Sequence, residues 1–441
     1  MRRLLSLYII CVLVCLSAHA QTRYVGGDIS LLPQYEKHNS YYKDASGSKI
    51  NNLLTWFISD CGWNTFRVRL FVNPQGKAAD GSADPAVCQD LAYVTALGKR
   101  IKEAGAYFLL DFHYSDTWVD ALNIQAPEAW KNADAAAKAD SLGNYTHRVL
   151  QTLKAAGATP DLIQVGNEIM YGLCDIKVSP YDDPSRNANW PSFIHLVKAG
   201  CDAVREECPE AKIIIHTDHP NEVSNTKYYY NKLINGGVDF DIIGLSYYPF
   251  WHGYLNTTST NLVNSINAYA EAFSDKTVQS VECAYNFQYW PDKGVKYDTR
   301  SIWACSVAGQ YNFVKDLVDA LKPLENVTGI NYWFPEEAGN GDDTNWSTSK
   351  GTVLISWLNR GFWNENQTTS GHAINRTAAP SATKTAEEVC APYYMRNFYK
   401  GEQDIESIPA LAPQARKLLL QGRLLIQRAD ALYAPDGCRL R

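Results

Sequence analysis

The chain has 441 residues and 46% of them are hydrophobic, which is enough to bury one large core and excludes disorder as the dominant state. Lys plus Arg number 41 against 47 Asp plus Glu, and no basic block stands out, so nucleic acid is not an expected partner. The 12 Trp and 27 Tyr fit either an aromatic-rich core or a surface that stacks on sugar rings.

Residues 1–20 have the features of a secretory signal peptide. Arg2 and Arg3 precede an apolar run over residues 4–16, and residues 18–20 (AHA) match a small-x-small cleavage pattern. Because the apolar run is too short for a comfortable membrane span, we expect no integral membrane segment and a protein that is secreted or held in the periplasm or at the cell surface. We also expect it to be a monomer. Cleavage before Gln21 removes Cys11 and Cys15 and leaves an odd number of cysteines, whose pairing the sequence does not assign.

Short β-rich runs alternate with helical patterns along residues 21–400, which predicts parallel strands joined by helical crossovers. One helix is predicted over Asp90–Gly105, where apolar residues recur at three- and four-residue intervals. Eight repeats predict a (β/α)8 TIM barrel with long top loops. A doubly wound open sheet is the alternative, although no Gly-rich phosphate fingerprint follows the first strand. The predicted strands are Tyr24–Gly27, Thr65–Leu70, Tyr107–Phe112, Leu162–Val165, Lys212–His216, Ile242–Leu245, Thr277–Val281 and Gly329–Tyr332.

Residues 401–441 are predicted to form a C-terminal tail, because the composition shifts after Arg376 and the barrel is expected to end near Phe398. The tail is predicted to contain a short helix followed by a hairpin with a Pro-Asp-Gly turn at residues 435–437. It loosely resembles the C-terminal tails of exported bacterial proteins, which implies an export or attachment element. A packing appendage is the alternative.

Every predicted strand carries or is followed by polar or aromatic side chains near its C-terminal end, where the active sites of such barrels lie. Because a buried polar group without a partner costs about 1–3 kcal/mol, convergence on one site explains this pattern better than folding does. The side chains predicted to form the site are Asp28, Arg67, His113, Asp116, Trp118, Asn167, Glu168, His216, Asp218, Tyr248, Glu282 and Trp333.

Glu168 and Glu282 are the two carboxylates that directly follow strongly apolar strands. Hydrolysis of a glycosidic bond needs two such groups: one protonates the departing oxygen, and the other attacks the anomeric carbon or activates water. A separation of about 5–5.5 Å between them favours a covalent intermediate and retention of configuration. For each glutamate alone, a structural salt bridge is the alternative.

Several motifs resemble those of the endo-β-1,4-galactanases of glycoside hydrolase family 53, also called arabinogalactan endo-β-1,4-galactosidases. The resemblance runs from about Tyr24 to Phe398 and implies a secreted, retaining enzyme that cuts internal β-1,4 bonds of galactan or type I arabinogalactan. The motifs are GGDIS (26–30), NTFRVRLFVNP (64–74), DFHYSDTW (111–118), QVGNEI (164–169), IIHTD (214–218), GLSYYPF (244–250), VECAY (281–285) and YWFP (332–335).

The resemblance implies that Glu168 is the general acid/base and Glu282 the nucleophile. It further implies that Asn167 binds the 2-hydroxyl of the cleaved sugar, that Arg67 keeps Glu282 ionised, and that Tyr248 donates a hydrogen bond to Glu282. Trp333 and Trp118 would be stacking platforms. The polar walls would come from His113, Asp116, His216 and Asp218, each of which could equally be a structural group.

No cofactor is expected, and polysaccharide is the expected partner. Some bacterial members of the family bind a structural calcium; residues 339–347 (GNGDDTNWS) offer oxygen ligands, although such loops are commonly turns. The loop over residues 171–180 (YGLCDIKVSP) lacks the tryptophan usual in the family, which leaves chain-length preference open. Two further readings also stay open: action on another β-linked polymer such as xylan or mannan, and a catalytically idle glycan-binding protein.

Overall fold

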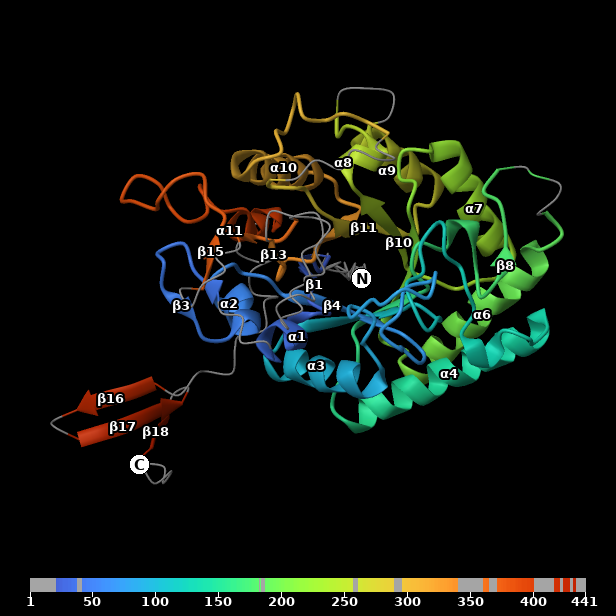
Figure 1. Cartoon of the computed structure of the whole chain (residues 1–441), viewed down its shortest axis with the longest axis horizontal. Helices are drawn as coiled ribbons and strands as arrows, with labels where there is room; N and C mark the ends of the chain where they lie inside the picture. Colours follow the sequence, from blue (N-terminus) through green and yellow to red (C-terminus); the bar gives the residue numbers. More distant parts are fainter. Residues whose placement is uncertain are drawn as a thin grey trace, which may run out of the picture.

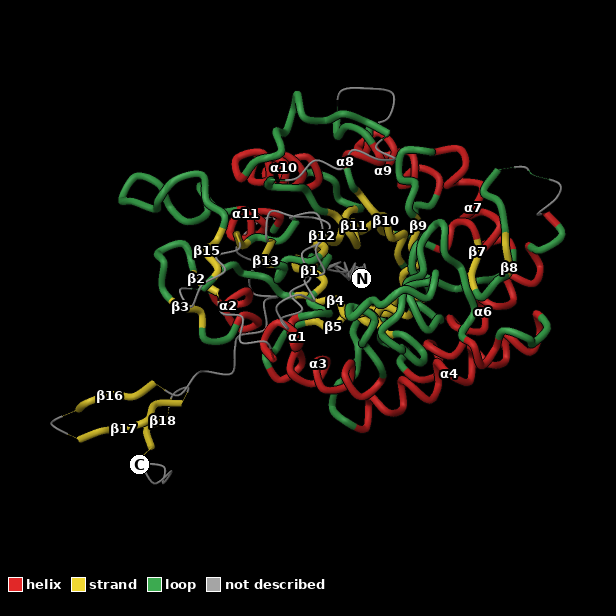
Figure 2. The backbone as a smooth tube through the Cα atoms, viewed as in Figure 1, coloured by secondary structure: helices red, strands yellow, loops and turns green. Residues whose placement is uncertain are grey.

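Eight parallel strands close into a barrel in the computed structural model (Figure 1 and Figure 2). The structure describes residues 21–37, 42–181, 183, 187–256, 261–288, 296–339, 360–364 and 371–399, together with the backbone of three short strands between 416 and 433. The barrel strands, in chain order, are β1 (Tyr24–Asp28), β4 (Thr65–Leu70), β5 (Tyr107–Phe112), β6 (Leu162–Val165), β9 (Lys212–Thr217), β10 (Ile242–Tyr247), β11 (Thr277–Cys283) and β12 (Val327–Trp333). The prediction of a (β/α)8 barrel is confirmed.

All eight predicted strands are present, and β4, β5 and β6 have the predicted bounds. The other five are longer by one to three residues, mostly at the end that faces the site. These extra residues include Asp28, Glu282 and Trp333. A search for apolar runs stops before them, because polar and aromatic residues interrupt the hydrophobic pattern while the backbone continues to pair.

Apolar side chains fill the barrel from inside and pack its outer face against the helices. Inside, five side chains from successive strands form a separate cluster: Leu109, Leu162, Ile214, Ile242 and Val281. Tyr24 and Tyr107, the first residues of β1 and β5, pack against this cluster from the amino-terminal end. Packed side chains therefore fill the barrel interior below the carboxyl-terminal ends of the strands.

Helices cover the outside of the barrel (Figure 2). The predicted helix over Asp90–Gly105 is α3 (Leu91–Glu103), with the Asp90 side chain accepting the Tyr93 N–H at 2.8 Å as its N-cap. The others are α1 (Leu32–Lys37), α2 (Leu53–Ser59), α4 (Ala135–Ala155), α6 (Trp190–Glu207), α7 (Val223–Asn235), α8 (Pro249–His252), α9 (Leu262–Ala272), α10 (Val307–Leu321) and α11 (Ala391–Tyr394), with the 3-10 turns η1 (Glu128–Trp130), η2 (Ile169–Tyr171) and η4 (Met395–Phe398). No helix in the described part of the chain is long and apolar enough to cross a membrane.

Smaller sheets lie outside the barrel strands. Segments from both ends of the barrel domain form one sheet, in the order β13 (Ala338–Gly339), β14 (Trp363–Asn364), β15 (His372–Ile374), β2 (Tyr42–Lys43) and β3 (Lys49–Ile50). The loop after η2 forms a two-stranded sheet of β7 (Gly172–Leu173) and β8 (Ile176–Lys177). The first of these sheets pairs residues 42–50, near the start of the barrel domain, with segments that follow the last barrel strand.

The prediction of a short helix in the C-terminal tail is wrong. The segment instead forms an antiparallel sheet of β16 (Arg416–Leu420), β17 (Arg423–Arg428) and β18 (Ala431–Tyr433). A short leucine-rich run has no distinguishing period, so it pairs as a strand as readily as it forms a helix once a neighbouring apolar run lies two residues away. Residues 1–20, the calcium-loop residues 340–347 and the Pro-Asp-Gly turn lie outside the described residues.

Candidate active site

A cavity of about 780 Å³ opens at the carboxyl-terminal ends of the barrel strands. Nine of the predicted site residues line it: Arg67, His113, Trp118, Asn167, Glu168, Asp218, Tyr248, Glu282 and Trp333. Further side chains complete the wall: Asp120, Leu122, His219, Lys296 and Arg360 from the loops, Trp251 and His252 from α8, and Arg69 from β4. Aromatic and aliphatic groups therefore share the cavity lining with charged and polar groups.

The turn after β6 aims Asn167 and Glu168 into the cavity. Gly166 has φ 88° and Glu168 has φ 47°, so the backbone enters the left-handed region twice within three residues. Glycine adopts this conformation without strain, whereas a glutamate held there is costly and such residues cluster at functional sites. The left-handed turn is how a buried strand presents two adjacent polar side chains beyond its end.

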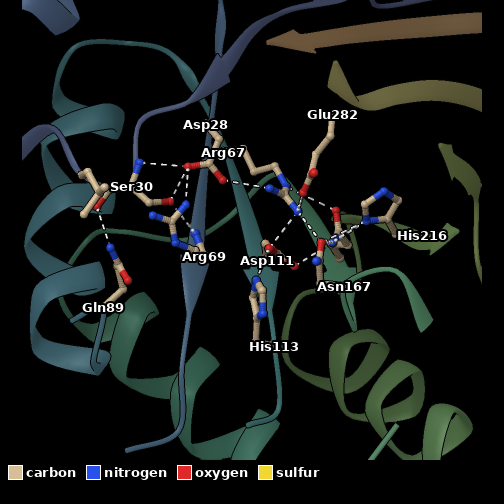
Figure 3. Close-up of polar contacts among 12 residues, drawn as sticks. Asp28, Ser30, Arg67, Arg69, Gln89, Asp111, His113, Asn167, His216 and Glu282 are labelled. Carbon is tan, nitrogen blue, oxygen red and sulfur yellow. Dashed lines mark hydrogen bonds and ion pairs between the residues drawn. The ribbon is translucent and has the colours of Figure 1, made fainter. Parts of the chain in front are cut away.

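Arg67 on β4 is the centre of the buried polar network (Figure 3). Its guanidinium lies 2.8 Å from Asp28, 2.8 Å from Asp111 and 2.9 Å from Glu282, and its side chain is 1% exposed. It also donates to Oδ1 of Asn167 at 2.8 Å. One buried cation thus fixes the positions of three carboxylates and an amide from four different strands or strand ends.

Glu282 has two partners on its carboxyl group. Oε1 forms an ion pair with Arg67 at 2.9 Å, and Oε2 accepts a hydrogen bond from the Tyr248 hydroxyl at 2.7 Å. Burial raises the pKa of Glu282, while Arg67 and Tyr248 lower it, and burial outweighs them. Arg67 therefore acts in the direction of ionisation, but desolvation is the larger effect on the pKa of Glu282, and the role of Arg67 in keeping Glu282 ionised stays a prediction.

Glu168 lacks a cationic partner among the described residues. Its Oε1 accepts the Ser246 hydroxyl, and no partner is recorded for Oε2 within the described part of the chain. Burial raises the pKa of Glu168 well above its usual value, and the negative charges of Glu282 and Asp218 raise it further. The two glutamates therefore differ: one is held by a cation and a phenol, and the other is buried near negative charge.

In the cavity wall, arginine guanidinium groups lie over aromatic rings. The Arg69 guanidinium lies 4.4 Å from the ring centroid of Trp118, and Arg360 lies 5.3 Å from that of Trp333. Arg360 also lies 4.9 Å from the ring of Tyr248. At the rim, Leu122 is 92% exposed and Trp251 is 38% exposed. Aromatic rings in a cavity wall suit the weakly polar faces of sugar rings.

Three predicted site residues do not line the cavity. The carboxylate of Asp28 accepts hydrogen bonds from the Arg67 and Arg69 side chains and from the backbone N–H of Ser30. Asp116 accepts the backbone N–H of Glu128 at 2.9 Å. His216 lies beside Asn167, with Nδ1 3.0 Å from Asn167 Oδ1 (Figure 3). Their predicted role in contacting substrate stays a prediction.

Sequence reasoning missed several residues that hold or line the site. Asp111 and Gln164 lie within predicted strands and both contact the Arg67 network, since Gln164 donates to Asp111 at 2.7 Å. The alternation of inward-facing positions along β5 and β6 could have found them. Arg360 lies 27 residues after the last residue of β12, so no local pattern relates it to a strand end. Within the described ranges, no cluster of three or more His, Cys, Asp or Glu side chains could hold a metal ion.

Comparison with known proteins identifies the family. Residues 24–374 match the model of glycosyl hydrolase family 53. The chain belongs to glycosyl hydrolase family 53. It is therefore a glycoside hydrolase, as the pair of glutamates predicts, and the family match covers the whole barrel and every residue that lines the cavity.

Relatives within family 53 agree along nearly their full length. The chain is 31% identical over 360 residues to a protein of Aspergillus fumigatus named probable arabinogalactan endo-beta-1,4-galactanase A, covering 79% of this chain and 94% of that protein. The Ignisphaera aggregans GH53 catalytic domain superposes with a TM-score of 0.68 at 26% identity, covering 86% and 97% of the two chains. A structure from a study of two fungal beta-1,4-galactanases superposes with a TM-score of 0.61 at 25% identity, covering 80% and 97%.

Proposed function

We propose that this enzyme is a secreted, endo-acting galactanase that hydrolyses internal β-1,4-galactosidic bonds of galactan or type I arabinogalactan with retention of configuration. The choice of galactan rests on the names of the relatives in family 53. The prediction of export rests on residues 1–20.

In this proposal Glu282 is the nucleophile and Glu168 the general acid/base. The observation that carries the assignment is the asymmetry of their contacts: Glu282 forms an ion pair with Arg67 and accepts the Tyr248 hydroxyl, whereas Glu168 accepts one neutral hydroxyl. A nucleophile must be ionised to attack, and an adjacent cation and a hydroxyl donor favour its ionised form. An acid must keep its proton until the bond breaks, which burial and the negative charge of Glu282 favour.

The two roles follow each other in one catalytic cycle. Glu282 attacks the anomeric carbon while Glu168 gives its proton to the departing sugar oxygen, and a galactosyl ester forms. Esterification removes the negative charge of Glu282, so the pKa of Glu168 falls and its carboxylate accepts a proton from the incoming water. The water oxygen attacks the anomeric carbon, the bond to Glu282 breaks, and both glutamates return to their starting states. Asn167, oriented by Arg67 and by its own Nδ2 bond to the Val119 carbonyl at 2.7 Å, would bind the sugar 2-hydroxyl.

The substrate assignment is tested by reducing-sugar release from potato galactan, xylan, mannan and arabinan. We expect release from galactan, with oligosaccharides as the first products. Activity on another polymer but not on galactan would overturn the substrate. Binding of galactan without any hydrolysis would favour the glycan-binding alternative.

The mechanism is tested with Glu282→Ala, and with Glu336→Gln as a matched variant of a buried glutamate that does not line the cavity. We expect Glu282→Ala to lose at least about a thousandfold in kcat/KM, because nucleophile and transition-state stabilisation are lost together. Glu336→Gln should keep its activity. Proton NMR of the first product should show the β-anomer, and a first-formed α-anomer would contradict retention.

A further inference from the structure

A buried hydroxyl links Glu168 to a histidine that does not touch the cavity. Oγ of Ser246 donates to Oε1 of Glu168 and lies 2.9 Å from Nε2 of His216. Ser246 and His216 are both 0% exposed. Ser246 is on β10, His216 on β9 and Glu168 at the end of β6, and these three strands are neighbours in the barrel, so the hydrogen-bonded series connects adjacent strands.

The direction of these hydrogen bonds follows from the groups around His216. Burial and the nearby charge of Arg67 lower the pKa of His216 well below its usual value, so the ring is neutral and carries one N–H. Its Nδ1 lies 3.3 Å from the backbone N–H of Glu168, a donor that cannot reverse. Nδ1 is therefore the acceptor, and the ring hydrogen is on Nε2, facing Ser246.

Asn167 does not require the opposite tautomer. Its Oδ1 lies 3.0 Å from His216 Nδ1, but it already accepts from Arg67 at 2.8 Å and from Gln164 Nε2 at 3.1 Å. Two donors satisfy the two lone pairs of an amide oxygen. The Ser246 hydroxyl thus accepts from His216 Nε2, which leaves its single hydrogen to point at Glu168.

We propose that Ser246 is a positioning residue for proton transfer: oriented by His216, its hydroxyl donates to Oε1 of Glu168 and so keeps the transferable proton on Oε2. Oε2 has no recorded partner among the described residues, and Glu168 lines the cavity. The acid proton is then on the oxygen available to the glycosidic bond. This inference rests on the proposed role of Glu168 as acid/base and assigns the serine that makes one of its two oxygens productive.

Removing the hydroxyl should raise the pKa of Glu168. The titratable groups that face Glu168 are Glu282 from β11, Asp218 after β9, Asp120 from the loop after β5, Tyr248 after β10, and the neutral His216. Burial and the three acids raise the pKa of Glu168, whereas the Ser246 hydrogen bond lowers it. Because the basic limb of the kcat/KM profile reports loss of the acid's proton, that limb should move to higher pH in a variant without the hydroxyl.

The test compares Ser246→Ala with Ser246→Thr, which keeps a hydroxyl. The substrates are aryl β-1,4-galactobiosides with a good and a poor leaving group. We expect the basic limb of Ser246→Ala to move up by about one pH unit, the amount that corresponds to one ordinary hydrogen bond. Its kcat/KM should fall about tenfold or more for the poor leaving group and much less for the good one, because only the poor one needs protonation. Ser246→Thr should restore both.

Three results would overturn the proposal: a basic limb that does not move, a limb that moves to lower pH, or equal losses for both leaving groups. If Ser246→Ala does not fold, Ser246→Cys, which has a weaker donor, should move the basic limb in the same direction. An unmoved basic limb in Ser246→Cys would also overturn the proposal. Failure of the underlying function is recognised separately. If Glu168→Gln keeps wild-type activity on the poor leaving group, then Glu168 is not the acid, whatever Ser246 does.

Discussion

Replacing Arg67 by methionine should destabilise the fold in a pH-dependent way. Met has a similar length but no charge, so Asp28, Asp111 and Glu282 would lose the nitrogen that now lies 2.8–2.9 Å from each. All three side chains are at most 8% exposed, so water cannot replace the cation. Removing one partner of a buried ion pair costs about 3–5 kcal/mol, which is a large share of a typical free energy of unfolding of about 5–15 kcal/mol.

The sign of the pH dependence follows from the carboxyl groups. In the wild type, burial raises the pKa of Asp111, but Arg67 and His113 outweigh it and the pKa is lowered, so its contribution to stability is present at neutral pH and is lost only as the pH falls through the folded-state pKa. Without Arg67 the pKa of buried Asp111 should rise above its unfolded value, and that of Glu282, which is already raised, should rise further. A raised folded-state pKa favours folding at low pH and is a penalty as pH rises. The loss in free energy of unfolding caused by Arg67→Met should therefore be largest at pH 7–8 and smaller near pH 5.

The assay is urea unfolding of wild type and variants at pH 5 and pH 7.5. The matched control is Arg100→Met, which removes a bidentate ion pair to Glu36 at 2.8 and 2.9 Å whose side chains are 34% and 37% exposed. Exposed pairs are worth about 0–1 kcal/mol, so the control should lose little at either pH. A loss in Arg67→Met no larger than in the control, or one that does not depend on pH, would refute the reasoning.

Three further outcomes are expected. Tyr248→Phe removes the donor to Glu282 and should raise the pKa of that carboxyl, so the acid limb of kcat/KM moves up by about one pH unit; Tyr254→Phe is the control, and an unmoved limb would contradict the assignment. Burial, together with the charge of Asp28, raises the pKa of Glu336 well above its usual value, so its charged form costs stability as pH rises; Glu336→Gln should raise Tm at pH 8 and leave it nearly unchanged at pH 4, and an equal effect at both would speak against a charge penalty. A Cβ on Gly309 would lie 1.7 Å from the Ala304 carbonyl oxygen, so Gly309→Ala should cost about 1–3 kcal/mol or more in thermal unfolding, whereas Gly143→Ala in α4, with 3.5 Å to its nearest neighbour, should be neutral or stabilising.

Strand positions and the pair of glutamates could be predicted from the sequence because both are local patterns. Each barrel strand is a short β-branched or apolar run between turn-forming residues, and Asn167, Glu168 and Glu282 come directly at the end of such a run. The polar and aromatic residues at the strand ends can also be identified from the local sequence, and nine of the side chains predicted in this way line the cavity. The C-terminal tail shows the limit of this reasoning, since a short leucine-rich run fits a helix and a strand equally well.

Tertiary structure alone decided how these groups act on one another. Arg67 meets Asp28, Asp111 and Glu282 only because closure of the barrel brings distant segments to one point, and no spacing in the sequence encodes that meeting. The difference between the two glutamates arises in the same way, from a cation beside one and a serine beside the other. Electrostatic effects depend on distance and burial, and both are properties of the folded chain rather than of neighbouring residues.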